Sequence, residues 1–188
     1  MYPRTVKPRY GTCAICGEQK PLTFEHIPPR SAYNNQTVVV LRGEKVLNHL
    51  VGQVERGQQQ QRGAGDWLTC AECNNKSGRW YVREYAAWVE RGIRILALVG
   101  GRERQDERTA ELVVRVPFEG VRPLLFLKQI VYMLLAVNPT GFGDVHPDLR
   151  QFVLSRDATG LSGACHFHLG LVWGPGMRHV GTTAKMGL

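Results

Sequence analysis

The fold of this chain is decided by the stretch Asp66-Trp67-Leu68-Thr69-Cys70-Ala71-Glu72-Cys73-Asn74-Asn75-Lys76, which joins two cysteines to the start of a helical pattern. A second pair with the same two-residue gap lies upstream, at Cys13-Ala14-Ile15-Cys16. Two C-x-x-C pairs supply four thiolates, the number that fills a tetrahedral structural zinc site. We therefore predict one structural zinc ion (Zn2+), held by Cys13, Cys16, Cys70 and Cys73.

The residues around the first pair agree with a metal site. Gly17 follows the second cysteine of that pair, where a glycine relieves crowding as the backbone curls around an ion. Disulfides are the competing interpretation, which the lack of a secretory signal disfavours. The fifth cysteine, Cys165, lies in an alternating apolar segment and is predicted to be a buried hydrophobic residue outside the site.

The composition limits the class of protein. With 188 residues and 43% hydrophobic content, the chain can bury one core of ordinary size, with the zinc module as a lobe of it. The formal charge of +8 favours a polyanionic partner. No apolar run follows the basic N-terminal residues, so we expect a cytoplasmic protein that does not associate with a membrane.

Hydrophobic patterning predicts an α+β order of elements. Residues 21–27 form a strand that ends at Pro28-Pro29, and residues 38–41 and 45–51 form a hairpin. The glutamine-rich residues 57–65 are predicted to be a mobile loop. The expected helices and later strands are a long helix from residue 79 to Gly100-Gly101, a strand at 111–117, a buried helix at 124–137, a short helix at 148–154 and a hairpin at 164–181.

Between the two cysteine pairs comes Thr23-Phe24-Glu25-His26-Ile27-Pro28-Pro29. Together with Cys-x-x-Cys-Asn-Asn-Lys, this motif resembles the HNH endonuclease family, the zinc-stabilised ββα-metal nucleases. The resemblance covers residues 13–80 and implies a metal-dependent endonuclease that hydrolyses phosphodiester bonds of DNA, or of RNA. Carried over by position, it makes His26 the general base and makes Glu25 and Asn74 ligands of a catalytic Mg2+ or Mn2+ ion.

The residue chemistry suits these roles. A neutral imidazole takes a proton from attacking water near neutral pH, and a carboxylate with a carboxamide oxygen suits a hard divalent cation. Basic side chains near the helix start, Lys76, Arg79 and Arg83, are predicted to bind the phosphate backbone. The family's middle asparagine, which braces the loop bearing the base, falls on Gly65, so Asp66 is expected to substitute for it or the brace is missing.

These patterns predict an α+β protein with two regions. Residues 1–99 form the HNH zinc-finger module with a hairpin insertion and the long helix, and residues 100–188 form an α/β region packed on it. The alternative function is a catalytically inactive, zinc-stabilised module that binds nucleic acid within a larger assembly. No nucleophile elbow, P-loop or dinucleotide fingerprint occurs in the sequence.

Overall fold

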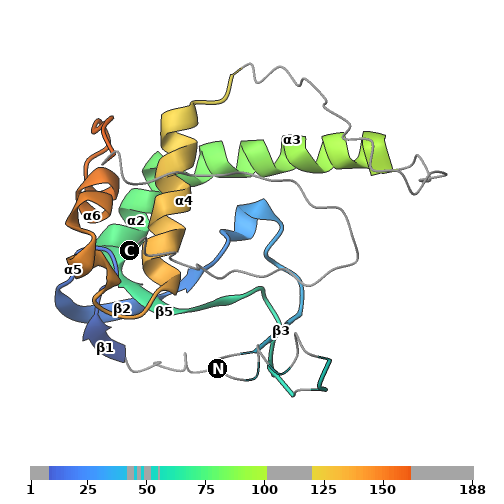
Figure 1. Cartoon of the computed structure of the whole chain (residues 1–188), viewed down its shortest axis with the longest axis horizontal. Coiled ribbons are helices and arrows are strands. Elements are labelled where there is room, and N and C mark those ends of the chain that lie inside the picture. The colour runs from blue at the N-terminus through green and yellow to red at the C-terminus, as the bar shows by residue number, and fades with distance from the viewer. Residues whose placement is uncertain are drawn as a thin grey trace, which may run out of the picture.

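The computed structural model describes residues 9–41, 45, 48, 52–54, 56–100 and 120–161. The strand predicted at 111–117 and the hairpin at 164–181, with Cys165, lie outside the described residues. In the described part the fold is mixed α+β, with two small sheets and five α-helices (Figure 1). None of the helices in these ranges combines the length and the apolar character needed to cross a membrane.

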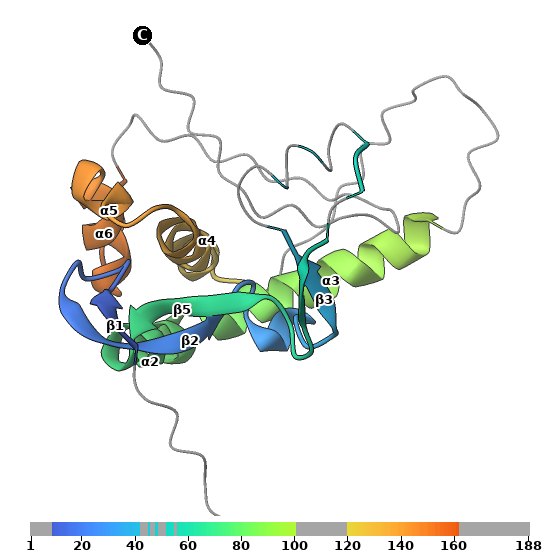
Figure 2. The ribbon, with the colours of Figure 1, turned by 90° about the horizontal axis from the view of Figure 1, so that it is seen from below.

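The main sheet has three antiparallel strands in the order β1-β2-β5. These are β1 (Arg9–Thr12), β2 (Gln19–His26) and β5 (Gly65–Cys70). The register of β2 against β5 shifts between Thr23 and Phe24, where β5 carries one extra residue. Figure 2 shows β2 and β5 side by side with α2 close to them. The strand predicted to end at the Pro28-Pro29 pair does end there, with His26 as its last residue.

The segment between β2 and β5 differs from its prediction. The 3-10 helix η1 (Arg30–Ala32) is followed by β3 (Val38–Val40), which pairs with β4 (Gln58–Gln60). The prediction of a loop was therefore wrong, since residues 58–60 form a strand. Of the partner predicted for β3, residues 45–51, the two described residues, Lys45 and Asn48, are helical, and the rest lies outside the described residues. Polar glutamines form β4 because backbone pairing needs no apolar side chain when both strands stay near solvent.

The helix after the second cysteine pair begins earlier than predicted and is broken. α2 (Ala71–Trp80) starts directly after Cys70, and α3 (Val82–Gly100) follows a break at Tyr81. The break has a tertiary cause, because the Tyr81 side chain is buried and its hydroxyl donates to the carbonyl oxygen of Val153 at 2.9 Å. The spacing of apolar residues in the sequence predicted one helix, whereas the structure has two helices that meet at the buried Tyr81.

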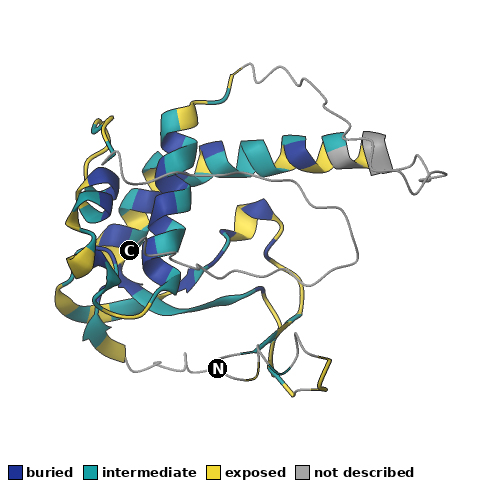
Figure 3. Cartoon of the chain, in the orientation of Figure 1, coloured by how far each residue is buried: buried dark blue, intermediate teal, exposed yellow. Residues whose placement is uncertain are grey.

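The C-terminal half contributes α4 (Pro123–Val137), α5 (Phe142–Val145) and α6 (Pro147–Leu154). The helices predicted at 124–137 and 148–154 are thus present. α4 lies across α2 and α3 and presents buried residues toward α2 and α6 (Figures 1 and 3). Its Lys128 and Gln129 are fully buried as well, although both looked like interruptions of the apolar pattern.

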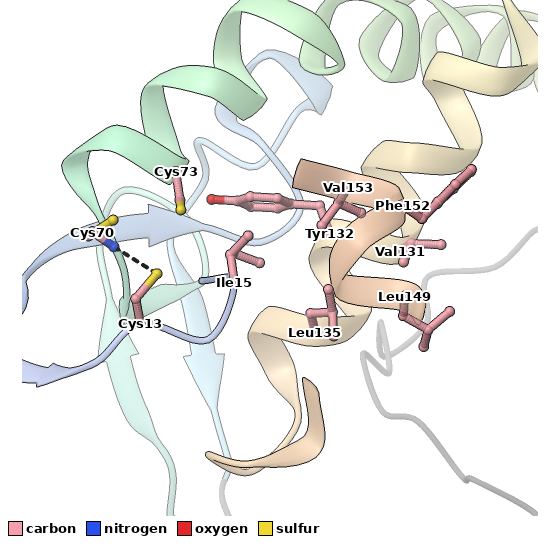
Figure 4. Close-up of a cluster of buried hydrophobic side chains, with 10 residues drawn as sticks. All are labelled: Cys13, Ile15, Cys70, Cys73, Val131, Tyr132, Leu135, Leu149, Phe152 and Val153. Atoms are coloured by element: carbon pink, nitrogen blue, oxygen red, sulfur yellow. Dashed lines mark hydrogen bonds between the residues drawn. The ribbon is translucent and has the colours of Figure 1, made fainter. Parts of the chain in front are cut away.

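One hydrophobic core joins the cysteine pairs to the C-terminal helices. Figure 4 shows its members, which are Cys13, Ile15, Cys70, Cys73, Val131, Tyr132, Leu135, Leu149, Phe152 and Val153. The three elements β2, β5 and α2 form a small ββα-type unit, and α4 and α6 close the side of it that bears the cysteines. The core therefore fixes the positions of the strands that carry the candidate functional residues.

Candidate functional site

The four predicted zinc ligands converge. The sulfur atoms of Cys13, Cys16, Cys70 and Cys73 all lie within 4.8 Å of one another. Four sulfurs at Zn–S bonds of ~2.3 Å would be separated by about 3.8 Å, so this cluster needs only a small contraction around an ion. The donor set and its spacing fit a structural zinc site.

Local backbone geometry turns each pair toward the cluster. The first pair lies in the turn between β1 and β2, where Gly17 has a φ of 78° and its N–H donates to the Cys13 carbonyl oxygen at 2.8 Å. The second pair spans the junction from β5 to α2, and the Cys70 N–H donates to Cys13 Sγ at 3.3 Å (Figure 4). Both turns therefore depend on backbone contacts that a bound ion would reinforce.

Two neighbouring thiols of the cluster shift each other's pKa in opposite directions. A hydrogen bond from the Cys73 thiol lowers the pKa of Cys13 to about 4. The same contact and the burial of the cluster raise the pKa of Cys73. A divalent cation bound here would stabilise the thiolate form of all four cysteines.

His26 ends β2 on the sheet face that bears Phe24 and Trp67. Its ring centroid lies 5.0 Å from that of Phe24, and Nε2 is 3.1 Å from the carbonyl oxygen of Arg62. Because a carbonyl can only accept, Nε2 carries the proton and Nδ1 holds the lone pair of the neutral ring. Burial and the nearby charge of Arg30 lower the pKa of His26, although the Arg62 carbonyl opposes this.

Glu25 leaves β2 on the other face. Its side chain is only 6% exposed, and Oε2 is buried with no hydrogen bond to the described residues. Burial raises the pKa of Glu25 to about 7, and the neighbouring Thr69 hydroxyl offsets a small part of the rise. Alternation along the strand thus separates the Glu25 and His26 side chains at the point where β2 ends.

Asn74 lies in the first turns of α2 on the Glu25 side of the sheet. Its Nδ2 donates to the Thr23 hydroxyl at 3.0 Å, and Thr23 Oγ1 donates in turn to the Thr69 carbonyl oxygen at 2.9 Å. Because its amide nitrogen is engaged in this way, Oδ1 is the atom with which Asn74 would bind a cation. Asn74 is thus linked to Thr23, whereas Glu25 neighbours Thr69 on the adjacent strand.

A brace that the sequence did not reveal is supplied by Asn34. This buried side chain donates from Nδ2 to the carbonyl oxygens of Pro28 and Ala64, at 2.5 and 2.7 Å, and accepts from the Ala64 N–H at 2.7 Å. It thereby joins the loop after His26 to the start of β5. The signal in the sequence is only one asparagine in the Asn34-Asn35 pair, and nothing local indicates a partner 30 residues away.

The same geometry explains why Gly65 occupies the position of the expected asparagine. A Cβ atom there would lie 2.3 Å from the Glu25 carbonyl oxygen and 2.6 Å from the Phe24 ring. No side chain fits, so the brace has to come from elsewhere. Asp66 does not replace it through Oδ1, which accepts from the N–H of its neighbour Trp67 at 2.9 Å.

Beside His26 lies a pocket of about 800 Å3, which we call the His26 pocket. Its lining includes two basic side chains, Arg9 and Arg62, from β1 and from the turn before β5. The predicted phosphate-binding residues Lys76, Arg79 and Arg83 are not among the residues that line it. Lys76 instead pairs with Glu72 at 2.8 Å on the surface of α2.

Comparisons with protein-family models, with curated proteins and with solved structures find no significant match for this chain. The function of the site is therefore inferred from the chemistry of its own residues. A cysteine cluster suited to zinc holds two strands and a helix together, with an imidazole and two guanidinium groups on one face. The other face carries a buried carboxylate that lacks a hydrogen bond at one oxygen.

Proposed function

We propose that this protein is an HNH-type endonuclease that hydrolyses phosphodiester bonds of nucleic acid, with DNA as the preferred substrate. The observation that carries the proposal is the position of His26. The imidazole stands at the end of a strand anchored to the cysteine cluster, and it opens onto a pocket that also contains Arg9 and Arg62. A general base beside two guanidinium groups suits attack on a phosphodiester.

In this proposal His26 is the general base. Its depressed pKa keeps the ring neutral at pH 7, and the hydrogen bond to the Arg62 carbonyl directs the lone pair to Nδ1. Nδ1 takes the proton of a water molecule as the water oxygen bonds to phosphorus and the bond to the leaving 3′ oxygen breaks. Arg9 and Arg62 hold the charged phosphate during this step.

Glu25 and Asn74 are the proposed ligands of a catalytic Mg2+ or Mn2+ ion. The fit rests on the buried Oε2 of Glu25, which makes no hydrogen bond to the described residues, and on Asn74, whose amide nitrogen is held by Thr23. A buried carboxylate without a partner is stabilised by a nearby cation. Glu25 and Asn74 would hold such an ion, which would supply positive charge that stabilises a leaving oxygen. The net charge of +8 favours the approach of the polyanionic substrate.

A second function, a nucleic-acid-binding module without catalysis, is favoured by one specific observation. Glu25 and His26 project from opposite faces of β2, so the proposed metal ligand and the proposed base do not share one face of the sheet. In the binding module, Arg9 and Arg62 hold the phosphate backbone while the carboxylate and the cysteine cluster only stabilise the fold.

Plasmid cleavage distinguishes the two functions. Supercoiled plasmid is incubated with the zinc-loaded protein, with and without magnesium or manganese, beside His26→Ala and His146→Ala. His146 is the matched control because it lies between α5 and α6, away from the pocket. Cleavage that needs the added metal and is lost only in His26→Ala supports the nuclease. Retention of plasmid in a gel shift, without cleavage by any of the proteins, supports the binding module.

A further inference from the structure

The volume of the His26 pocket is that of a small-molecule site. At about 800 Å3 it falls within the ~300–1,000 Å3 range of sites that enclose a small molecule. Its walls come from two sheets, because Phe24 and Trp67 belong to β2 and β5 and Gln58 belongs to β4. The pocket therefore has room for a chemical group next to the phosphate.

One wall of the pocket is aromatic. The rings of Phe24 and Trp67 meet edge to face, with centroids 6.3 Å apart and planes at 87°. Phe24 remains 37% exposed, although it lies on a paired strand. Above the indole of Trp67 lies the guanidinium carbon of Arg9, 5.5 Å from the ring centroid. The aromatic surface of Phe24 and Trp67 thus lies next to the positive charge of Arg9.

The pocket lining also offers amide groups, from Gln58, Gln60 and Gln61. Gln60 is occupied, since its side chain both donates to and accepts from the backbone of Gly65. Gln58 and Gln61 are exposed, and their side chains make no hydrogen bond to another described residue. Each carries both a donor and an acceptor, which matches the mixed donor and acceptor edge of a nucleobase.

The charged residues that line the pocket are Arg9, Arg62 and one acidic residue, Asp66. Arg9 and Arg62 form no ion pair with a carboxylate in the described part of the chain. An aromatic wall, exposed amide groups and adjacent guanidinium groups together suit a nucleotide, whose flat base and charged phosphate lie a few ångströms apart.

We infer that the His26 pocket binds an unpaired nucleotide, with its base between the aromatic wall and Gln58 and Gln61 and its phosphate on Arg9 and Arg62. This inference rests on the proposed function, because it names the substrate of the same site. In a duplex the faces of a base are stacked and its pairing edge is used, so only a single-stranded or extruded base presents the groups that this pocket contacts. The substrate class is therefore single-stranded or locally opened nucleic acid.

Fluorescence anisotropy tests the inference without cleavage, in buffer that lacks magnesium and manganese. The probes are a fluorescein-labelled single-stranded 12-mer, its blunt duplex and a duplex with an unpaired bulge, each as DNA and as RNA. The single strand and the bulged duplex are expected to bind at least about tenfold more tightly than the blunt duplex. Equal or tighter binding of the blunt duplex overturns the inference.

Variants of the aromatic wall and of the amide groups locate the binding. Phe24→Leu keeps an apolar side chain but removes the aromatic face, and it should weaken single-strand binding about fivefold or more while leaving duplex binding unchanged. Tyr10→Leu is the matched control, since Tyr10 is 75% exposed on β1 and does not line the pocket. Gln58→Ala and Gln61→Ala change exposed side chains and test the amide groups if Phe24→Leu fails to fold. Single-strand binding that none of these variants weakens overturns the inference.

The outcomes separate this inference from the proposed function. Selective single-strand binding that depends on Phe24, without plasmid cleavage, supports the pocket and contradicts the nuclease. Metal-dependent cleavage of a fully paired duplex that Phe24→Leu leaves unchanged supports the nuclease and contradicts the pocket.

Discussion

The side chain of Asn34 and the backbone of Ala64 bind each other in both directions, with Nδ2 donating to the carbonyl oxygen and Oδ1 accepting from the N–H, each at 2.7 Å. A third bond, from Nδ2 to the Pro28 carbonyl oxygen, adds the loop that follows His26. Because Asn34 is only 5% exposed, water does not readily replace these bonds. One buried amide therefore reinforces the β2–β5 pairing that places His26 beside Gly65.

Asn34→Ala should lower the free energy of unfolding by about 1–3 kcal/mol, because it removes the side-chain partner of two half-buried groups, the Pro28 carbonyl and the Ala64 N–H, while the Ala64 carbonyl still accepts from the Ile27 N–H. It should also reduce any nuclease activity in the folded fraction by loosening the His26 loop. Chemical denaturation and plasmid cleavage measure the two effects. Asn35→Ala is the matched control, since Asn35 is exposed and its side chain bonds only to that of Gln36. Equal stability of the two variants would contradict the bracing role.

Metal content provides the second prediction. Elemental analysis should find about one zinc ion per chain, and its removal by a chelator should abolish the cooperative unfolding transition, because three of the four ligands belong to the main core. Cys73→Ser should bind zinc poorly and lose the same transition, whereas Cys165→Ser should retain both. A well-folded protein without any metal would refute the zinc site.

The third prediction concerns the buried Lys128. Its Nζ donates to the carbonyl oxygens of Phe152 and Ser155, at 2.5 and 2.6 Å, and so caps the C-terminal end of α6 with a positive charge. Lys128→Met keeps the length of the side chain but leaves both carbonyls without this donor. It should cost about 2 kcal/mol of stability in thermal or chemical denaturation. Lys20→Met, which changes a surface lysine paired with Glu18, should change stability little; equal effects would argue against the cap.

The fourth prediction is a pH dependence that arises from Glu25. Its folded-state pKa of about 7 lies above the ordinary value of 4.5, so the folded protein binds the proton more tightly than the unfolded chain does. The bound proton contributes its full stabilisation below about pH 4.5, and this contribution is lost as the pH rises through about 7. Once it is lost entirely, the free energy of unfolding is lower by about 3 kcal/mol. Glu25→Gln should therefore gain stability relative to the unaltered protein between about pH 5.5 and about pH 8.

Chemical denaturation at the two pH values, in zinc-loaded protein without magnesium, measures this difference. Added magnesium or manganese should restore stability at the higher pH in the unaltered protein and not in Glu25→Gln, because the cation would take the place of the proton. A difference between the two proteins that stays constant with pH would contradict the assignment of the buried carboxylate.

The part of the site that was predictable from sequence is the part held by local spacing. Two C-x-x-C pairs predict that their four sulfurs lie close together, because each pair forms a short local turn and four thiolates fill one zinc site. The end of β2 at His26 followed from the two prolines after it, and the buried helix α4 followed from its apolar length. These features need no knowledge of what packs against them.

The features that were missed depend on distant partners. Asn34 acts on Ala64, 30 residues away, and the break between α2 and α3 follows from the contact of Tyr81 with Val153, 72 residues away. Lys128 looked like an interruption of the apolar pattern, because its carbonyl partners lie at the end of another helix. Strand β4 consists of glutamines, so only its pairing with β3 identifies it.

The most direct test of the central claim is the rate of metal-dependent cleavage by the unaltered protein and by His26→Gln, with zinc content and melting temperature measured on the same samples. The account predicts that His26→Gln folds and binds zinc normally but cleaves at least about a hundredfold more slowly. Equal cleavage rates, in samples with equal zinc content and equal melting temperature, would contradict the assignment of His26 as the general base.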